Sequence, residues 1–336
     1  MKLSIGIVGL PNVGKSTLFK ALTKNDILIA NYPFATIDPN VGVVAVPDER
    51  LDILEKLSKS AKKIPAVVEF YDIAGLVKGA SEGQGLGNQF LSHIRETDAV
   101  VQVVRCFGAG EVIHVENTID PSRDIDTINT ELALRDLDTV QKRIGKLEGE
   151  ARTGDKSKIK ELELIRQLEK QLSENKPLYF LGKEITDNPV VKSLNLLTAK
   201  PQIFLLNGKP EDVSQEIKKR INEDLKAEYI ISDLGVEPDL AGLIKKAYEI
   251  LNLISFFTTG EDETRAWTII NGWKAPQAAG TIHTDFENKF IRAEVVFWKD
   301  LADAGGWPQA KQKGKIRLEG KDYVVKDGDV MVIRHG

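Results

Sequence analysis

A phosphate-binding pattern lies close to the N-terminus. The segment Gly9-Leu10-Pro11-Asn12-Val13-Gly14-Lys15-Ser16 fits G-x-x-x-x-G-K-[ST] without a mismatch. In such a loop the backbone N–H groups, together with those of the helix that follows, point at one spot and attract phosphate. The lysine reaches the β- and γ-phosphates, and the hydroxyl after it binds Mg²⁺. The segment therefore predicts a nucleoside triphosphate site, with Lys15 as its catalytic cation and Ser16 as a ligand of Mg²⁺.

The flanking residues favour this interpretation over a chance glycine loop. Residues 3–8 predict a buried strand and residues 17–22 predict a helix. Strand, loop and helix in this order are the context that the pattern requires. For Asn12 two roles stay open: it could bind a K⁺ ion beside the phosphates, or its side chain could stiffen the loop. The residues expected to contact the nucleotide from this segment are Asn12, Val13, Gly14, Lys15, Ser16 and Thr17.

Two further residues are candidates for the Mg²⁺ site. Residues 27–42 have no clear period and contain two prolines, which predicts a loop that folds over the nucleotide. Such loops in switch NTPases are ordered by the γ-phosphate and Mg²⁺, and Thr36 is the hydroxyl that could bind the metal. Asp72 follows a predicted strand over residues 66–71, at the sheet edge where ligands bind. We expect Asp72 to hold Mg²⁺ directly or through water, and Gly75 to place an N–H near the γ-phosphate.

The group that would orient the attacking water is not the usual one. Switch NTPases often carry a glutamine after the glycine of D-x-x-G, whereas this chain has Leu76, which cannot hydrogen-bond water. Among the four histidines, His114 follows a predicted strand over residues 99–104 through a short loop. An imidazole can orient water or accept its proton. His114 is therefore a candidate catalytic residue, with a surface or packing histidine as the alternative.

The segment Asn207-Gly208-Lys209-Pro210 lies where a GTPase carries N-K-x-D, directly after a predicted strand over residues 201–206. The aspartate of N-K-x-D accepts hydrogen bonds from guanine, and the proline ring of Pro210 cannot accept them. A site without that partner loses strong discrimination for guanine. We expect Asn207 and Gly208 to contact the nucleotide, and the sequence argues against strict use of GTP while it permits adenine.

Length and composition indicate a globular protein of two or three domains, with 336 residues, of which 42% are hydrophobic and 29% charged. The net charge of -4 excludes a polycation that binds nucleic acid over its whole surface. The single cysteine, Cys106, suits a reducing cytosol. Neither a signal peptide nor a bilayer-spanning apolar run is visible, so we expect a cytoplasmic protein.

The periodicities predict an α/β fold with three parts. Residues 1–122 and 198–252 would form a doubly wound sheet of the P-loop NTPase type. Helical periodicity with a break near residues 149–155 predicts an antiparallel helical hairpin inserted within residues 123–197. Residues 253–336 contain short strands and one helical stretch, which predicts a small mixed sheet crossed by a helix, a β-grasp domain.

More detailed assignments follow from the same patterns. Residues 48–58 predict a helix of the nucleotide-binding domain, since leucines recur on one face. In the C-terminal domain, residues 277–286 predict a helix and residues 323–325 a strand. Residues 228–232 are either the last strand of the first sheet or the start of a helix.

The chain resembles the YchF, or Obg-like, ATPases, which are relatives of the Obg GTPases. The resemblance implies a nucleotide-binding domain, an inserted helical hairpin and a C-terminal TGS-like domain. It also implies a preference for ATP over GTP, ribosome-associated regulatory roles, and a hydrophobic residue, Leu76, where other NTPases have glutamine. The family has N-x-x-E at the base-binding loop, where this chain has Pro210 at the fourth position. The matching segments are residues 9–17, 31–36, 72–80, 85–91, 129–132, 265–269, 275–280 and 320–325.

The leading interpretation is a slow ATPase that acts as a cytoplasmic switch with the ribosome as its partner. Phosphoryl transfer needs positioning and charge stabilisation, which Lys15 and Mg²⁺ would supply. A nucleotide-sensing scaffold with negligible turnover is the first alternative, and Leu76 favours it. A GTPase of the Obg type is the second.

Overall fold

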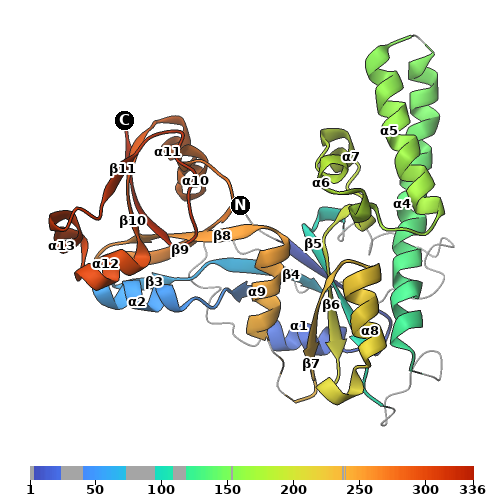
Figure 1. Ribbon diagram of the computed structural model, residues 1–336, viewed down its shortest axis with the longest axis horizontal. Helices are drawn as coiled ribbons and strands as arrows, with labels where there is room; N and C mark the ends of the chain where they lie inside the picture. Colours follow the sequence, from blue (N-terminus) through green and yellow to red (C-terminus); the bar gives the residue numbers. More distant parts are fainter. Residues whose placement is uncertain are drawn as a thin grey trace.

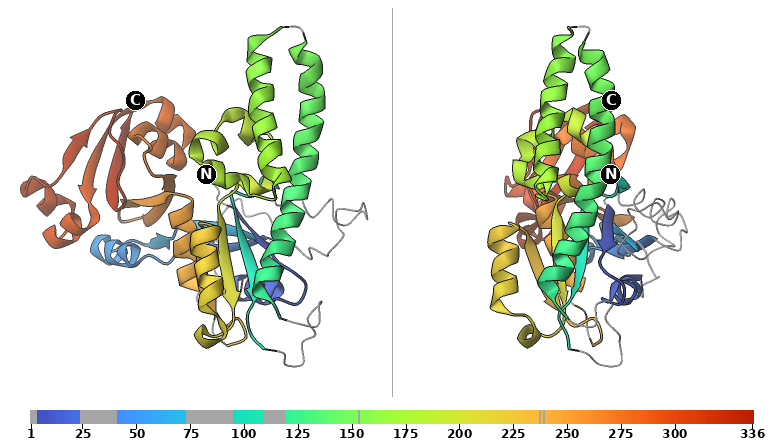
Figure 2. Two further views of the ribbon diagram at one scale, coloured as in Figure 1. Left: turned by 45° about the vertical axis from the view of Figure 1, so that its right-hand side comes forward. Right: turned by 90° about the vertical axis from the view of Figure 1, so that its right-hand side faces the viewer.

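Two six-stranded sheets organise the part of the chain that the structure describes (Figure 1). The structure is a computed structural model that describes residues 4–23, 41–72, 95–108, 119–152, 154–236, 238 and 240–336. A long helical hairpin projects away from the first sheet, and the C-terminal residues build most of the second (Figures 1 and 2).

The first sheet has the strand order β2-β4-β1-β5-β6-β7. Its strands are β1 (Ser4–Val8), β2 (Val41–Ala45), β4 (Val67–Asp72), β5 (Ala99–Arg105), β6 (Gln202–Asn207) and β7 (Glu228–Ser232). All neighbours are parallel except β2 and β4. Residues 228–232 therefore form a strand, which settles the alternative that the sequence left open. Because the other five strands are parallel, their carboxyl ends meet at one edge, where sheets of this kind bind ligands.

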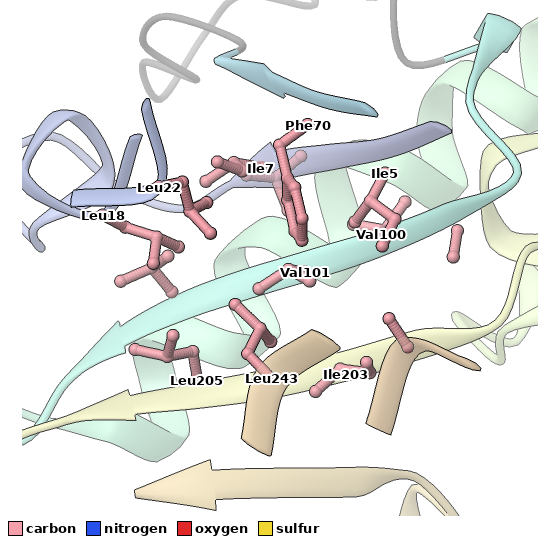
Figure 3. Packing of buried hydrophobic residues seen from close by; sticks show 14 of the residues in the cluster. Ile5, Ile7, Leu18, Leu22, Phe70, Val100, Val101, Ile203, Leu205 and Leu243 are labelled. Carbon is pink, nitrogen blue, oxygen red and sulfur yellow. The ribbon is translucent and has the colours of Figure 1, made fainter. Parts of the chain in front are cut away.

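Helices cover both faces of this sheet, namely α1 (Lys15–Thr23), α4 (Pro121–Ala151), α8 (Gln215–Lys219) and α9 (Leu240–Ile250). The side chains of β6 alternate between the two faces. Ile203 and Leu205 belong to the core under α1 and α9, where Leu18 and Leu243 also lie (Figure 3). Phe204 and its neighbour Leu206 pack instead with residues of α8 and of the start of α4. Burial on both faces explains why the strands are almost continuously apolar.

The second sheet has the strand order β11-β10-β12-β8-β9-β3 and is mixed. Its strands are β3 (Lys62–Ile64), β8 (Leu253–Thr259), β9 (Glu263–Ile270), β10 (Phe290–Phe297), β11 (Arg317–Glu319) and β12 (Asp329–His335). Alanines of α10 (Ala275–Ile282) pack with Phe256 and Met331 in its core. The predicted small mixed sheet with one packed helix is thus present, whereas the β-grasp and TGS-like descriptions stay predictions.

The segment from α2 (Glu49–Ser58) to β3 differs from the predicted domain division. It lies within residues 1–122, yet β3 pairs with β9 of the second sheet. Leu54 of α2 packs in one cluster with Phe257 of β8, and the Arg50 guanidinium pairs with Asp327 at 2.7 Å. Periodicity shows which face of a helix is apolar but not which sheet covers that face, so the sequence could not show this association.

Two predictions for the C-terminal region need correction. Residues 323–325 do not form a strand, since Val324 makes only an isolated bridge with Lys274. The helix predicted over residues 277–286 is split at His283 into α10 and α11 (Thr284–Asn288). Two short helices that the sequence did not predict follow β10, namely α12 (Trp298–Ala304) and α13 (Trp307–Gln312).

The predicted helical hairpin is present and consists of α4 and α5 (Lys156–Ser173) (Figure 2). Asp120 caps the start of α4 by accepting a hydrogen bond from the Arg123 N–H, and Pro121 is the first helical residue. The chain returns to β6 through η3 (Leu178–Leu181), α6 (Lys183–Thr186), α7 (Pro189–Ser193) and η4 (Leu197–Ala199). Within the described part of the chain, every helix is too short or too polar to span a bilayer.

A buried carboxylate ties the hairpin to the strand that follows it. Asp136 of α4 is fully buried and accepts hydrogen bonds from the Leu197 N–H at 2.9 Å, the Thr198 N–H at 2.7 Å and the Thr198 hydroxyl at 2.7 Å. Burial raises the pKa of Asp136 to about 6, although these three hydrogen bonds act in the opposite direction. Asp136 thus serves as the cap of η4 and fixes the start of the path into β6.

Replacing Asp136 with alanine should destabilise the protein by about 3 kcal/mol, because two buried N–H groups and a hydroxyl lose their acceptor. Urea titration followed by circular dichroism would measure the change as a lower midpoint. Asp138→Ala is the matched control, since Asp138 lies on the same helix with its side chain 59% exposed. Equal midpoints for Asp136→Ala and Asp138→Ala would contradict this role of Asp136.

Candidate nucleotide-binding site

The loop between β1 and α1 has the backbone conformation that its two glycines allow. Gly9 has φ 150° and Gly14 has φ 110°, a region that side chains with a Cβ rarely adopt. A Cβ on Gly9 would lie 2.5 Å from the Val103 carbonyl oxygen, and one on Gly14 would lie 2.5 Å from Nδ2 of Asn207. The fixed glycines of the motif are therefore required by conformation and by close packing.

Lys15 begins α1 and its side chain is buried, with 8% of the residue exposed. Its Nζ donates a hydrogen bond of 2.7 Å to the Leu10 carbonyl, which holds the ammonium group inside the loop. Burial lowers the pKa of Lys15 to about 8, and the nearby Asp72 carboxylate opposes that shift. Ser16 and Thr17 follow on the first turn of α1 and are exposed. The N–H groups of a first helical turn have no partner within the helix, so they are available to an anion.

Asp72 ends β4 and lies beside β1, where its register partner is Ile7. Its Oδ1 is buried without a hydrogen-bond partner among the described residues. Burial raises the pKa of Asp72, and the charge of Lys15 acts against this shift. A buried carboxylate oxygen without a hydrogen-bond partner among the described residues, together with the exposed Ser16 hydroxyl on the first turn of α1, is a donor set that suits a hard cation such as Mg²⁺.

The other predicted positions fall partly within the described residues. Asn12 adopts a left-handed conformation with φ 63° and is exposed, whereas Val13 is buried. Thr36, Gly75 and His114 lie outside the described residues, so their predicted roles stay predictions.

Asn207 joins three loops of the site. Asn207 lies at the carboxyl end of β6. Its Nδ2 donates a hydrogen bond of 2.8 Å to the Val13 carbonyl of the P-loop, and its Oδ1 accepts a hydrogen bond of 3.1 Å from the Leu234 N–H. Leu234 follows β7, so one buried amide fixes the P-loop against the ends of two neighbouring strands. The sequence predicted Asn207 as a nucleotide contact but missed this bridge and missed Leu234. The spacing of the strands gave no signal for a contact across the site.

The loop after β6 contains no aspartate at the position where a GTPase would have one. Pro210 begins a short 3₁₀ turn, η5 (Pro210–Asp212), and Asp212 accepts a hydrogen bond of 2.9 Å from the Lys209 N–H. Gly208 lies against the chain after β5, since a Cβ there would lie 3.2 Å from the Phe107 N atom. The structure thus places Phe107, an aromatic residue that the sequence analysis missed, beside the predicted base-binding loop.

The lowered pKa of Lys15 predicts a pH dependence of ATP binding. A lysine is charged only below its pKa, so the ammonium of the free protein is progressively lost as the pH rises through about 8. Bound phosphate groups favour the charged form, and affinity should therefore be constant below pH 8 and fall by at most about tenfold per pH unit above it. Titrations between pH 7 and 9.5 would measure this fall.

Lys15→Arg is the matched control for that titration, because a guanidinium stays charged throughout this range. Its affinity should not vary with pH, whatever its absolute value. A wild-type affinity that is equal at pH 7 and pH 9.5 would show that Lys15 does not titrate there.

Known proteins are similar to this chain over nearly its whole length. Residues 4–142 match the family described as 50S ribosome-binding GTPase, and residues 253–336 match YchF-GTPase_C, described as a protein of unknown function (DUF933). The chain is 46% identical to the ribosome-binding ATPase YchF of Bacillus subtilis (strain 168), with 99% of each protein covered. It is also 46% identical to the protein of the same name from Haemophilus influenzae, again with 99% of each covered.

A solved structure supports the same relationship. The Schizosaccharomyces pombe YchF GTPase is 40% identical to this chain, and its structure superposes with a TM-score of 0.86 over 99% of this chain and 98% of that one. Both family matches, the relatives and this structure agree with the P-loop fold and the C-terminal region described above, and the chain belongs to the YchF family.

Proposed function

We propose that this chain binds ATP and hydrolyses it slowly, as a cytoplasmic switch that associates with the ribosome. The observation that carries the proposal is the P-loop itself, in which the Lys15 ammonium is buried, donates to the Leu10 carbonyl and lies within the electrostatic influence of the Asp72 carboxylate. The names of the bacterial relatives, ribosome-binding ATPases, support the choice of nucleotide and of partner.

Each residue of the site would have a separate task. Backbone N–H groups of the P-loop and of the first turn of α1 would hold the phosphates, and Lys15 would stabilise negative charge that develops during transfer. Ser16, Thr36 and Asp72 would hold Mg²⁺, which when bound neutralises charge on the β- and γ-phosphates. A K⁺ ion held by Asn12 is a further candidate.

The loop after β6 bears on the choice between adenine and guanine. Pro210 has no acceptor for the donor edge of guanine, so the site lacks the contact by which GTPases select GTP. The Schizosaccharomyces pombe relative is named a GTPase, while the bacterial relatives are named ATPases. We favour ATP because of Pro210, and a GTPase of the Obg type stays the alternative.

The attacking water needs a polar group, since Leu76 cannot orient it. His114 or a group of the ribosome would take that role, and slow turnover of the isolated protein would follow. If neither acts, the protein would be a nucleotide sensor that binds ATP without meaningful turnover.

Steady-state phosphate release from ATP separates the switch from the sensor. The purified chain should release phosphate slowly, and 50S subunits or 70S ribosomes should raise the rate. Parallel reactions in K⁺ and in Na⁺ test the predicted monovalent cation. Tight ATP binding with no release above the background under any of these conditions would reject the ATPase and leave the sensor.

A further inference from the structure

The described residues fix the direction in which a nucleotide would lie along the sheet edge. In the strand order, β1 and its P-loop stand between β4 on one side and β5, β6 and β7 on the other. Asp72, the proposed metal ligand, ends β4 and marks the side of the γ-phosphate. The base, at the other end of the nucleotide, therefore lies toward the ends of β6 and β7.

Asp233 stands at that end of the site, directly after β7. Its neighbours in the chain, Ser232 and Leu234, are hydrogen-bonded to the loop that follows β6 and to the end of β6. The Ser232 carbonyl accepts from the Gly208 N–H at 3.2 Å, and the Leu234 N–H donates to Asn207. The Asp233 side chain is half-buried, and its Oδ1 accepts a hydrogen bond of 2.9 Å from the Gly235 N–H. One carboxylate oxygen is thereby held in the turn, and Oδ2 accepts no hydrogen bond from the residues that the structure describes.

The other acidic groups on this edge are less well placed to recognise a base. Glu211 and Asp212 are exposed on η5, and one oxygen of Asp212 accepts from the Lys209 N–H. The Asn207 side chain is occupied at both ends by Val13 and Leu234. Among the described residues of the loops that follow β6 and β7, Asp233 is thus the half-buried carboxylate.

We propose that the Asp233 carboxylate determines the preference for adenine, by accepting a hydrogen bond from the amino group at C6. Guanine and hypoxanthine carry an oxygen at C6, which a carboxylate repels, because neither atom has a proton to donate. The proposal rests on the proposed function, since it presupposes a nucleotide in the P-loop. The Asp233 carboxylate would thus recognise the base, which Pro210 cannot do.

The test compares ATP with inosine triphosphate, whose base has an oxygen at C6 in place of the amino group of adenine and lacks the amino group that guanine carries at C2. Dissociation constants for the full chain are measured by competition with a fluorescent ATP analogue. The wild type should bind ATP about tenfold more tightly than inosine triphosphate, the size expected for one such contact. Asp233→Asn keeps an oxygen for the Gly235 N–H and presents a donor to the base, so its preference should invert. Asp233→Ala should abolish the preference without inverting it.

Glu211→Gln is the matched control, because it removes an exposed carboxylate from the neighbouring loop and should leave the ratio unchanged. An unchanged ratio in Asp233→Asn and Asp233→Ala would overturn the role of Asp233, while the wild-type preference for ATP would still support the proposed function. A wild type that prefers inosine triphosphate would overturn both.

Discussion

Replacing Lys15 with alanine is expected to weaken ATP binding by at least about 100-fold, because two charge-assisted contacts to phosphate are lost. The fold should survive the change. Burial lowers the pKa of Lys15, which means that the folded state disfavours its charge, so removal of the ammonium group should not reduce stability. Isothermal titration calorimetry with ATP and Mg²⁺ measures the affinity, and a thermal melt measures stability.

Lys20→Ala is the control for this variant, since Lys20 is an exposed lysine in the last turn of the same helix. Its ATP affinity should equal that of the wild type. Near-native ATP affinity in Lys15→Ala would reject the assignment of the P-loop.

Asn207→Asp should reduce both stability and nucleotide affinity. The aspartate keeps an oxygen for the Leu234 N–H but loses the donor to the Val13 carbonyl, and it places a negative charge against that carbonyl in a buried position. Such a change costs about 3 kcal/mol. The P-loop loses its support at the same time, so ATP binding should weaken by about tenfold or more.

The matched control for this pair of effects is Asn271→Asp, because the Asn271 amide donates to Asn252 at 3.3 Å on the exposed surface. Its urea midpoint and ATP affinity should stay close to those of the wild type. If Asn207→Asp matched this control in both measurements, the bridge from Val13 to Leu234 would have no energetic importance.

Local patterns explain which parts of the site could be predicted. The P-loop is encoded by one short segment with a strand before it and a helix after it, and the structure has all three in that order. Asp72 was predicted at a strand end because an aspartate after an apolar run reaches the ligand edge of such a sheet. The P-loop and the position of Asp72 could both be predicted because each depends only on residues that are neighbours in the sequence.

Contacts between distant residues explain what the sequence could not show. Asn207 hydrogen-bonds to Val13, 194 positions earlier. Asp136 hydrogen-bonds to Leu197 and Thr198, 61 and 62 positions later. The pairing of β3 with β9 likewise joins residue 62 to residue 263. No periodicity records such partners, because it reports the exposed and buried faces of one element at a time.

An equilibrium competition between ATP and GTP for the purified chain tests the central claim most directly. Both nucleotides displace the same fluorescent analogue, at equal Mg²⁺ and salt, so the ratio of dissociation constants reports the base alone. The account predicts that ATP binds at least as tightly as GTP, because Pro210 removes the guanine contact. A preference for GTP of tenfold or more, about 1.4 kcal/mol, would contradict it.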